Sequence, residues 1–67
     1  MQISARNRLA GTITSIKLGG VMAEVVLEVG ENEIVSVVTR TSVEELGLAE
    51  GDQVTAIIKS TEVMLAR

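Results

Sequence analysis

The chain has 67 residues, no cysteine and no histidine, and six basic against nine acidic side chains give it a net charge of −3. These numbers exclude a disulfide-stapled domain and a zinc site built on cysteine and histidine. A domain of this size buries only about 60% of its unfolded surface, yet 46% of the residues are hydrophobic. Oligomerisation is the remaining route to stability, so the composition predicts a homo-oligomer.

The absence of aromatic residues further restricts the kinds of partner that the protein can bind. Single-stranded nucleic acid is usually held by aromatic side chains that stack on bases, and a negative net charge opposes a phosphate backbone. We therefore expect no nucleic-acid partner. The sequence shows no signal peptide and no transmembrane run, so we expect no membrane partner and a cytoplasmic location.

Charge is unevenly distributed along the chain. Residues 1–23 carry three cations and no acid, residues 24–58 carry eight acids against the single cation Arg40, and residues 59–67 carry two cations against one acid. An acidic chain that keeps its cations near its ends suits a positive locus for a small anion. Chance in a short chain explains the same pattern equally well.

In the first part of the chain apolar and polar residues alternate in short runs separated by glycine-containing turns, which is typical of an antiparallel meander. We expect strands over residues 3–18, Val21–Val29 and Ile34–Thr39. Gly11 inside the first strand predicts a bulge or the close approach of another backbone. Gly19-Gly20 predicts a two-residue hairpin with positive φ. One face of the second strand is wholly apolar, with Val21, Ala23, Val25, Leu27 and Val29.

The spacing of the apolar residues then changes from the period of a strand to that of a helix, which predicts one short helix over Thr41–Leu48. Two overlapping capping boxes fit its start, Thr41 with Glu44 and Ser42 with Glu45. Gly47 is the expected left-handed residue that ends it. After the helix we expect a fourth strand over Gln53–Ser60 and a short fifth strand over Glu62–Ala66.

This element order predicts an all-β fold, a five-stranded OB-fold-like Greek-key barrel with one short helix between strands 3 and 4. An SH3-like barrel is the nearest alternative. Several strands are apolar on both faces, as at Val25-Val26 and Ile57-Ile58. A barrel needs only one apolar face, so the other is expected to pack against a second chain. We expect residues 1–67 to form a single, free-standing domain.

The available residue types disfavour catalysis. Without histidine, cysteine or tyrosine, few general bases and nucleophiles are left, and the acids form no paired motif. Glu31-Asn32-Glu33 offers fewer oxygens than a calcium loop requires. Gly19-Gly20 lacks the following lysine of a phosphate-binding loop. The sequence therefore predicts a protein that is not an enzyme.

Anion binding fits the residues better, because two clusters of hydrogen-bond donors lie near the chain ends. They are Ser4-Ala5-Arg6-Asn7 and Lys59-Ser60-Thr61. A tetrahedral dianion offers only acceptors, so hydroxyls, backbone N–H groups, lysine and arginine suffice to bind it. Enough donors for four oxygens come from Ser4, Arg6, Lys59 and Ser60, with the Ala5 amide in addition. Alternatively, Arg6 and Lys59 are surface cations paired with neighbouring glutamates.

Four segments together resemble a known family. They are Ser4-Ala5-Arg6-Asn7, Ala23-Glu24-Val25-Val26-Leu27, Ser42-Val43-Glu44-Glu45-Leu46-Gly47 and Lys59-Ser60-Thr61-Glu62-Val63-Met64. In this order and spacing they closely resemble the molbindins, small molybdate-binding proteins of the Mop family. The same module occurs in molybdate-responsive regulators and in the ATPase subunits of molybdate transporters. The resemblance covers the whole chain and implies an OB-like fold.

The resemblance also implies an assembly and a ligand. The family forms hexamers, trimers of dimers that share strands, and binds molybdate or tungstate at subunit interfaces for molybdenum storage and homeostasis. Hydrogen bonds hold the oxyanion, with no protein ligand on the metal and no organic cofactor. The first kind of site maps to Ser4, Ala5 and Arg6 of one chain and Lys59 and Ser60 of another. A second site uses backbone near the first hairpin, here Gly20 and Val21.

Two other functions stay open at this point. One is a nucleic-acid-binding OB-fold module of the cold-shock type, which the missing aromatic residues oppose. The other is a structural oligomerisation domain from a larger regulator.

Overall fold

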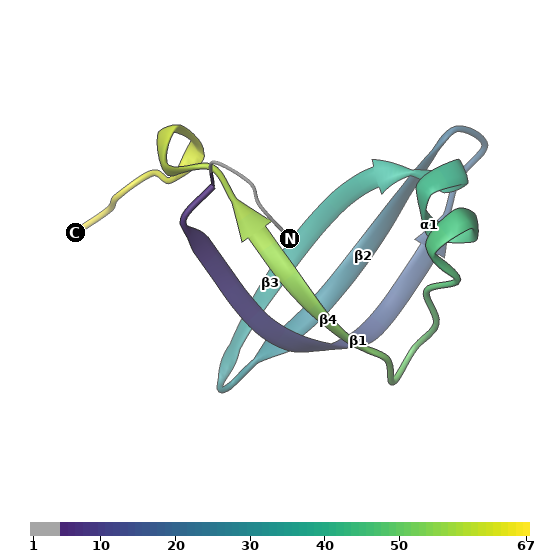
Figure 1. Ribbon diagram of the computed structural model, residues 1–67, viewed down its shortest axis with the longest axis horizontal. Helices are drawn as coiled ribbons and strands as arrows, with labels where there is room; N and C mark the ends of the chain where they lie inside the picture. Colours follow the sequence, from purple (N-terminus) through teal and green to yellow (C-terminus); the bar gives the residue numbers. More distant parts are fainter. Residues whose placement is uncertain (1–4) are drawn as a thin grey trace.

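The described part of the chain, residues 5–67 of a computed structural model, forms one strongly curved antiparallel sheet with a short helix at one end (Figure 1). The strand order is β3-β2-β1-β4. The elements are β1 Asn7–Leu18, β2 Met22–Val29, β3 Asn32–Thr39, α1 Arg40–Leu46, β4 Gln53–Ile58 and a 3-10 turn, η1, at Ser60–Glu62. Within residues 5–67 no helix has the length and apolarity needed to cross a membrane.

The long strand β1 organises the sheet because it pairs with two others. Its second half pairs with β2, and its first half pairs with β4. The register against β2 shifts between Ile13 and Ser15, which places a bulge at Thr14. Bulges sharpen the twist of a strand. At the same point Gly51 and Asp52 exchange backbone hydrogen bonds with Ile13 at 2.8 and 2.9 Å, so the turn before β4 docks on the bulge.

Gly11 permits the close packing of β1 against β2. A Cβ atom at this position would lie 2.9 Å from the Glu28 carbonyl oxygen and 2.8 Å from the Val29 Cγ2 atom. Of the two alternatives for this glycine, the close backbone approach is therefore the correct one, and the bulge lies three residues further on. The sequence pattern of β-branched residues alone does not fix which residue leaves the ladder.

The core is small and lies on the concave face of the sheet, under α1. Its buried residues are Ile13, Ala23, Val25, Leu27 and Val43. The three from β2 belong to the predicted apolar face, so the period-two pattern correctly assigned the side of the strand that turns inward. Val43 is the buried residue of α1 and joins the helix to the sheet.

The helix begins earlier than predicted. Strand β3 runs directly into α1, and the N-cap is Thr39, whose side-chain oxygen accepts from the Ser42 N–H at 3.1 Å. Both predicted capping boxes are therefore wrong, because the last residue of β3 already has the extended conformation of a cap. The predicted stop is confirmed, since Gly47 has φ 63° and its N–H bonds back into the helix.

The Gly19-Gly20 connection also differs from its prediction. The positive-φ glycines of the described residues are Gly30, Gly47 and Gly51, so this hairpin does not use left-handed glycines. Its connection spans residues 19–21. Gly19 is needed for another reason, since a Cβ there would lie 2.8 Å from the Met22 carbonyl oxygen.

The predicted five-stranded barrel is corrected to an open four-stranded sheet. Residues 60–62 form η1, and residues 63–67 form no strand in place of the predicted Glu62–Ala66. Met64 and Leu65 are 93% and 95% exposed. Within residues 5–67 this apolar tail pairs with no edge of the sheet, so β3 and β4 are unpaired edges in the described part of the chain and the barrel does not close there.

Gly11→Ala is expected to lower the free energy of unfolding by about 1–3 kcal/mol, because the added methyl group overpacks against the β2 backbone. Thermal unfolding followed by circular dichroism measures the change. Gly20→Ala is the matched control, since its Cβ would meet nothing within 4 Å. Equal stability of the two variants would contradict the close approach at Gly11.

Candidate functional site

The pairing of β1 with β4 brings the two chain ends together. The last assigned pair is Asn7 with Ile58, so residues 5–6 and 59–61 lead away from the same end of the sheet. There Ala5, Lys59, Ser60 and Thr61 line a hollow of about 270 Å³. The two donor clusters of the sequence, 54 residues apart between Ala5 and Lys59, thus meet within a single chain.

The donors of the hollow are not engaged by the described residues. Within residues 5–67 no hydrogen bond uses the side chains of Lys59, Ser60 or Thr61, or the backbone N–H groups of Ser60 and Thr61. The backbone of η1 explains the free N–H groups, since the first amides of any helical turn lack an acceptor behind them. The hollow therefore presents hydroxyls, amides and an ammonium group to whatever enters it.

Arg6 follows Ala5 in the chain but does not line the hollow, and the alternation of an extended chain places its side chain on the same face as Arg8. Both side chains are exposed. Across residues 5–67 the one ion pair joins Arg40 to Glu44, so neither Arg6 nor Lys59 pairs with a glutamate there. The alternative of ordinary surface ion pairs for these two cations is not supported. Ser4, the remaining predicted donor, lies outside the described residues.

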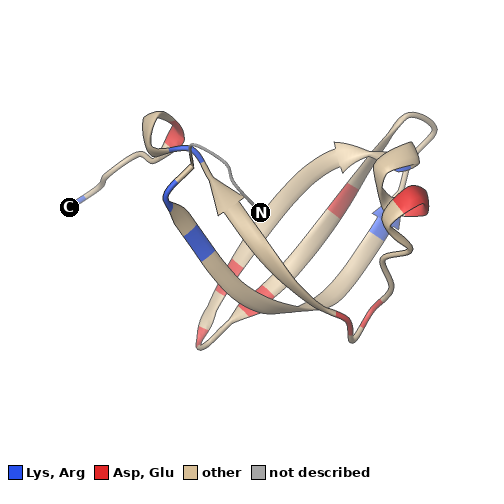
Figure 2. Ribbon diagram, in the orientation of Figure 1, with Lys and Arg blue, Asp and Glu red and all other residues tan. Residues whose placement is uncertain are grey.

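The charges are segregated along the sheet. Figure 2 shows cations at the start of β1 and the end of β4, with the acid Glu62 of η1 beside them, and acids gathered toward the β2–β3 turn and the segment before β4, while Lys17 and Arg40 lie at the end of β1 and the start of α1. The cations at the hollow end are Arg6, Arg8 and Lys59, and the acids at the other end are Glu28, Glu31, Glu33, Glu50 and Asp52. A divalent anion is attracted to the first end and repelled by the second. Among the described residues, no cluster of three or more acids is placed to hold a metal ion.

The predicted second site lies elsewhere, in the connection between β1 and β2. Gly20 and Val21 are both exposed there, at the opposite end of β1 from the hollow. The single chain therefore does not bring the two predicted sites together. Arg40 contacts this connection, because its Nη1 donates to the Gly19 carbonyl oxygen at 3.1 Å and its backbone N–H donates to Val21 O at 2.8 Å.

Two residues were absent from the predicted sites and lie at them. Thr61 lines the hollow, and it belongs to the donor cluster that the sequence already displayed. Arg40 reaches the second site from the helix, which no local motif reveals. The sequence offered one indication that Arg40 is unusual, since it is the one cation among eight acids in residues 24–58.

The curved sheet with its single short helix defines a small all-β domain of the OB-like class. A family model described as the TOBE domain matches residues 3–65. "Molybdenum-pterin-binding protein 1" of Clostridium pasteurianum is 54% identical over 66 residues, which cover 97% of each chain.

Solved structures agree with this match. A molybdate-binding protein from Sporomusa ovata superposes with a TM-score of 0.96 at 42% identity, over the full length of both chains. The cytoplasmic molybdate-binding protein ModG, in a form with molybdate bound, superposes with a TM-score of 0.84 at 46% identity, over 90% of this chain and 43% of that one. The chain belongs to the TOBE-domain family and to its molbindin, or Mop, members. The names of these relatives describe binding proteins and not enzymes, in agreement with the prediction from the sequence.

Arg8→Gln is expected to weaken the binding of a small divalent oxyanion severalfold at low salt, because Arg8 adds to the positive field without lining the hollow. The effect should vanish as the screening length falls from about 30 Å at 0.01 M salt to about 3 Å at 1 M. Isothermal titration calorimetry at both salt concentrations measures it. Lys17→Gln removes the same charge from the far end of β1, beside the Gly20–Val21 connection, and should leave the affinity of the hollow, followed at the Ser60 amide by NMR, unchanged.

Proposed function

We propose that this protein binds molybdate, and tungstate equally, in the cytoplasm, for molybdenum storage and homeostasis. The observation that carries the proposal is the hollow at Ala5, Lys59, Ser60 and Thr61, where an ammonium group, two hydroxyls and the Ser60 and Thr61 amides donate no hydrogen bond within residues 5–67. Relatives that match the whole chain are named as molybdate-binding or molybdenum-pterin-binding proteins, which supports the identity of the ligand. An oxyanion of charge −2 matches a site built from donors and cations.

The oxyanion is held by hydrogen bonds rather than by protein ligands on the metal. Ser4, Ala5 and Arg6 supply hydroxyl, amide and guanidinium groups, and Lys59 and Ser60 supply an ammonium and a hydroxyl group. No organic cofactor is needed. With no aromatic residue in the chain, no aromatic side chain is available to stack on a pterin ring.

We infer that a second copy of the chain completes the site. The hollow opens to solvent, and the exposed donors around it would surround only part of a tetrahedral ion. A charge-assisted hydrogen bond gains strength where water is excluded. A neighbouring chain that covers the hollow and adds its own Ser4 and Arg6 would enclose the ion, as in a site at a subunit interface.

The apolar surface supports assembly, which we propose to be a hexamer built as a trimer of dimers. An apolar groove of about 420 Å³ runs between the edge strands β3 and β4. Val35 and Val37 on the outer side of β3 are 54% and 63% exposed. The unpaired edges and the exposed tail at residues 63–65 complement each other, so the tail of one chain is suited to pair with an edge of the next. A strand shared in this way would supply the fifth strand of the barrel.

Anion selectivity tests the ligand. Molybdate and tungstate are larger tetrahedral anions than sulfate, so donors fixed at their spacing leave sulfate with stretched bonds that contribute little. Calorimetric titration with molybdate, tungstate, sulfate and phosphate is expected to give similar affinities for the first two and much weaker binding of the others. Sulfate binding as tight as molybdate binding would refute the proposal.

Arg6→Ala tests the mode of binding. Loss of one charge-assisted donor should weaken molybdate binding by about 1.5–3 kcal/mol and leave the assembly intact. Native mass spectrometry with and without molybdate reports the number of subunits and bound ions together. Lys17→Ala is the control for a cation lost away from the hollow, and it should leave the number of subunits and the binding at the hollow unchanged. Dissociation of the assembly on Arg6→Ala would make Arg6 a structural residue instead.

A further inference from the structure

Two carbonyl oxygens of the connection between β1 and β2, those of Gly19 and Val21, accept hydrogen bonds from the protein, whereas the Gly20 carbonyl accepts none from residues 5–67. The Gly19 N–H donates to Met22 O at 2.8 Å, the Arg40 N–H donates to Val21 O at 2.8 Å, and Arg40 Nη1 donates to Gly19 O at 3.1 Å. Two of these three bonds come from Arg40. Carbonyl oxygens repel an approaching anion, so engaging them removes an obstacle to anion binding at this turn.

The amides of the same turn are free. Within residues 5–67 the N–H groups of Gly20 and Val21 donate to no backbone or side-chain acceptor. Both residues are exposed, and the space beside Gly20 is open, since a Cβ placed there would meet nothing within 4 Å. Adjacent donors in open space, beside the occupied Gly19 and Val21 carbonyls, form a surface that can bind an anion.

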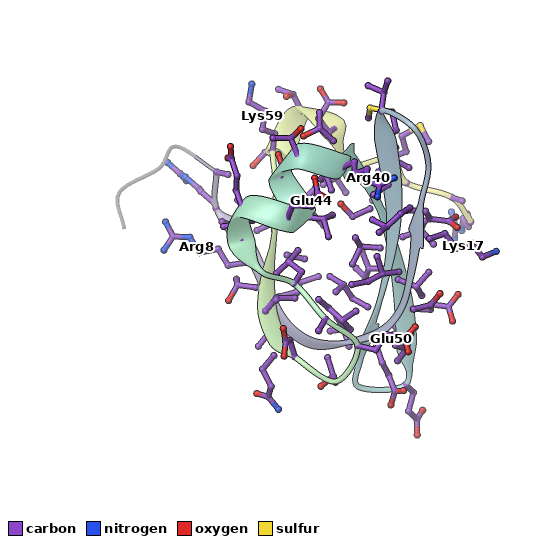
Figure 3. All side chains as sticks on the ribbon, turned by 90° about the vertical axis from the view of Figure 1, so that its right-hand side faces the viewer. Arg8, Lys17, Arg40, Glu44, Glu50 and Lys59 are labelled. Carbon is purple, nitrogen blue, oxygen red and sulfur yellow. The ribbon has the colours of Figure 1, made fainter. Side chains whose placement is uncertain are left out.

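Arg40 adds the positive charge that such a surface needs. Figure 3 shows Arg40 on the side of α1 that faces the neighbouring strands, while Arg8 and Lys17 point away into solvent. Glu44 lies 3.7 Å from Arg40 Nε, but the two side chains are 43% and 61% exposed. An exposed pair of this kind contributes little and does not cancel the guanidinium charge. The N–H groups of the guanidinium fork that do not bind Gly19 remain available.

We propose that Arg40 is the positioning residue of the second oxyanion site at Gly20 and Val21. This inference rests on the proposed function, the binding of molybdate. The Arg40 side chain engages the Gly19 carbonyl and its backbone N–H engages the Val21 carbonyl, which leaves the Gly20 and Val21 amides to bind the ligand, and the guanidinium places a positive charge beside them. The helix thereby contributes to a site that otherwise consists only of backbone. Loss of the side chain would free the Gly19 carbonyl and remove the charge at once.

The test is a titration of the assembled, isotope-labelled protein with molybdate, followed by amide NMR. The Gly20 and Val21 amides report the turn, and the Ser60 amide reports the hollow. In Arg40→Met, the turn should bind molybdate at least about tenfold more weakly, the loss expected for one charge-assisted hydrogen bond. The hollow should keep its affinity. Arg40→Lys, which retains the charge and one donor, should restore part of the loss.

Glu44→Gln is the matched control, because it removes the partner of Arg40 and leaves the bond to Gly19 in place. It should bind molybdate at the turn as tightly as the parent protein or more tightly. Equal affinity of Arg40→Met and the parent at Gly20 and Val21 would overturn the inference. Equal weakening at the turn and at Ser60 would also overturn it, since that result indicates a general structural role.

The parent protein separates this inference from the proposed function. A response at Ser60 with none at Gly20 and Val21 would overturn the second site and the role of Arg40, and leave binding at the hollow established. No response at either place would refute molybdate binding by this protein.

Discussion

The antiparallel pairing of β1 with β4 is the contact on which both the fold and the hollow depend. It runs from Thr12 opposite Gln53 to Asn7 opposite Ile58, and it carries two segments from opposite ends of the chain to one end of the sheet. The donors at residues 5–6 and 59–61 meet only because this ladder ends where it does. β1 reaches β4 while still pairing with β2 because a bulge at Thr14 and a glycine at position 11 let it curve.

A small core sets the second constraint. Five buried residues hold the sheet and α1 together, while both sheet edges and an apolar tail remain exposed. A chain with this much unpartnered apolar surface and two open edges is poorly suited to exist alone. In the proposed assembly a second copy covers the edges and also closes the hollow, so stability and ligand binding would share one interface.

The sequence predicted several local features correctly. Its predictions were wrong for features that depend on contacts between distant parts of the chain. The apolar face of β2 and the left-handed Gly47 follow from residue periodicity and backbone sterics, and both are confirmed. The fifth strand at Glu62–Ala66 was predicted from alternation alone, but a strand exists only where an edge is available to pair with it. The N-cap was predicted at the wrong residue because Thr39 is both the last residue of β3 and the N-cap of α1.

The sequence by itself determined the kind of chemistry available. Without histidine, cysteine or aromatic side chains, and with cations held near the ends of an acidic chain, the residues suit a small anion. Its family resemblance was also readable from four short segments. Only the tertiary structure decided that Ala5 and Lys59–Thr61 share one hollow and that Arg40 reaches the Gly19 carbonyl. The physical reason is that both contacts depend on sheet register and on the position of α1, which are set by pairing and packing between segments far apart in the sequence.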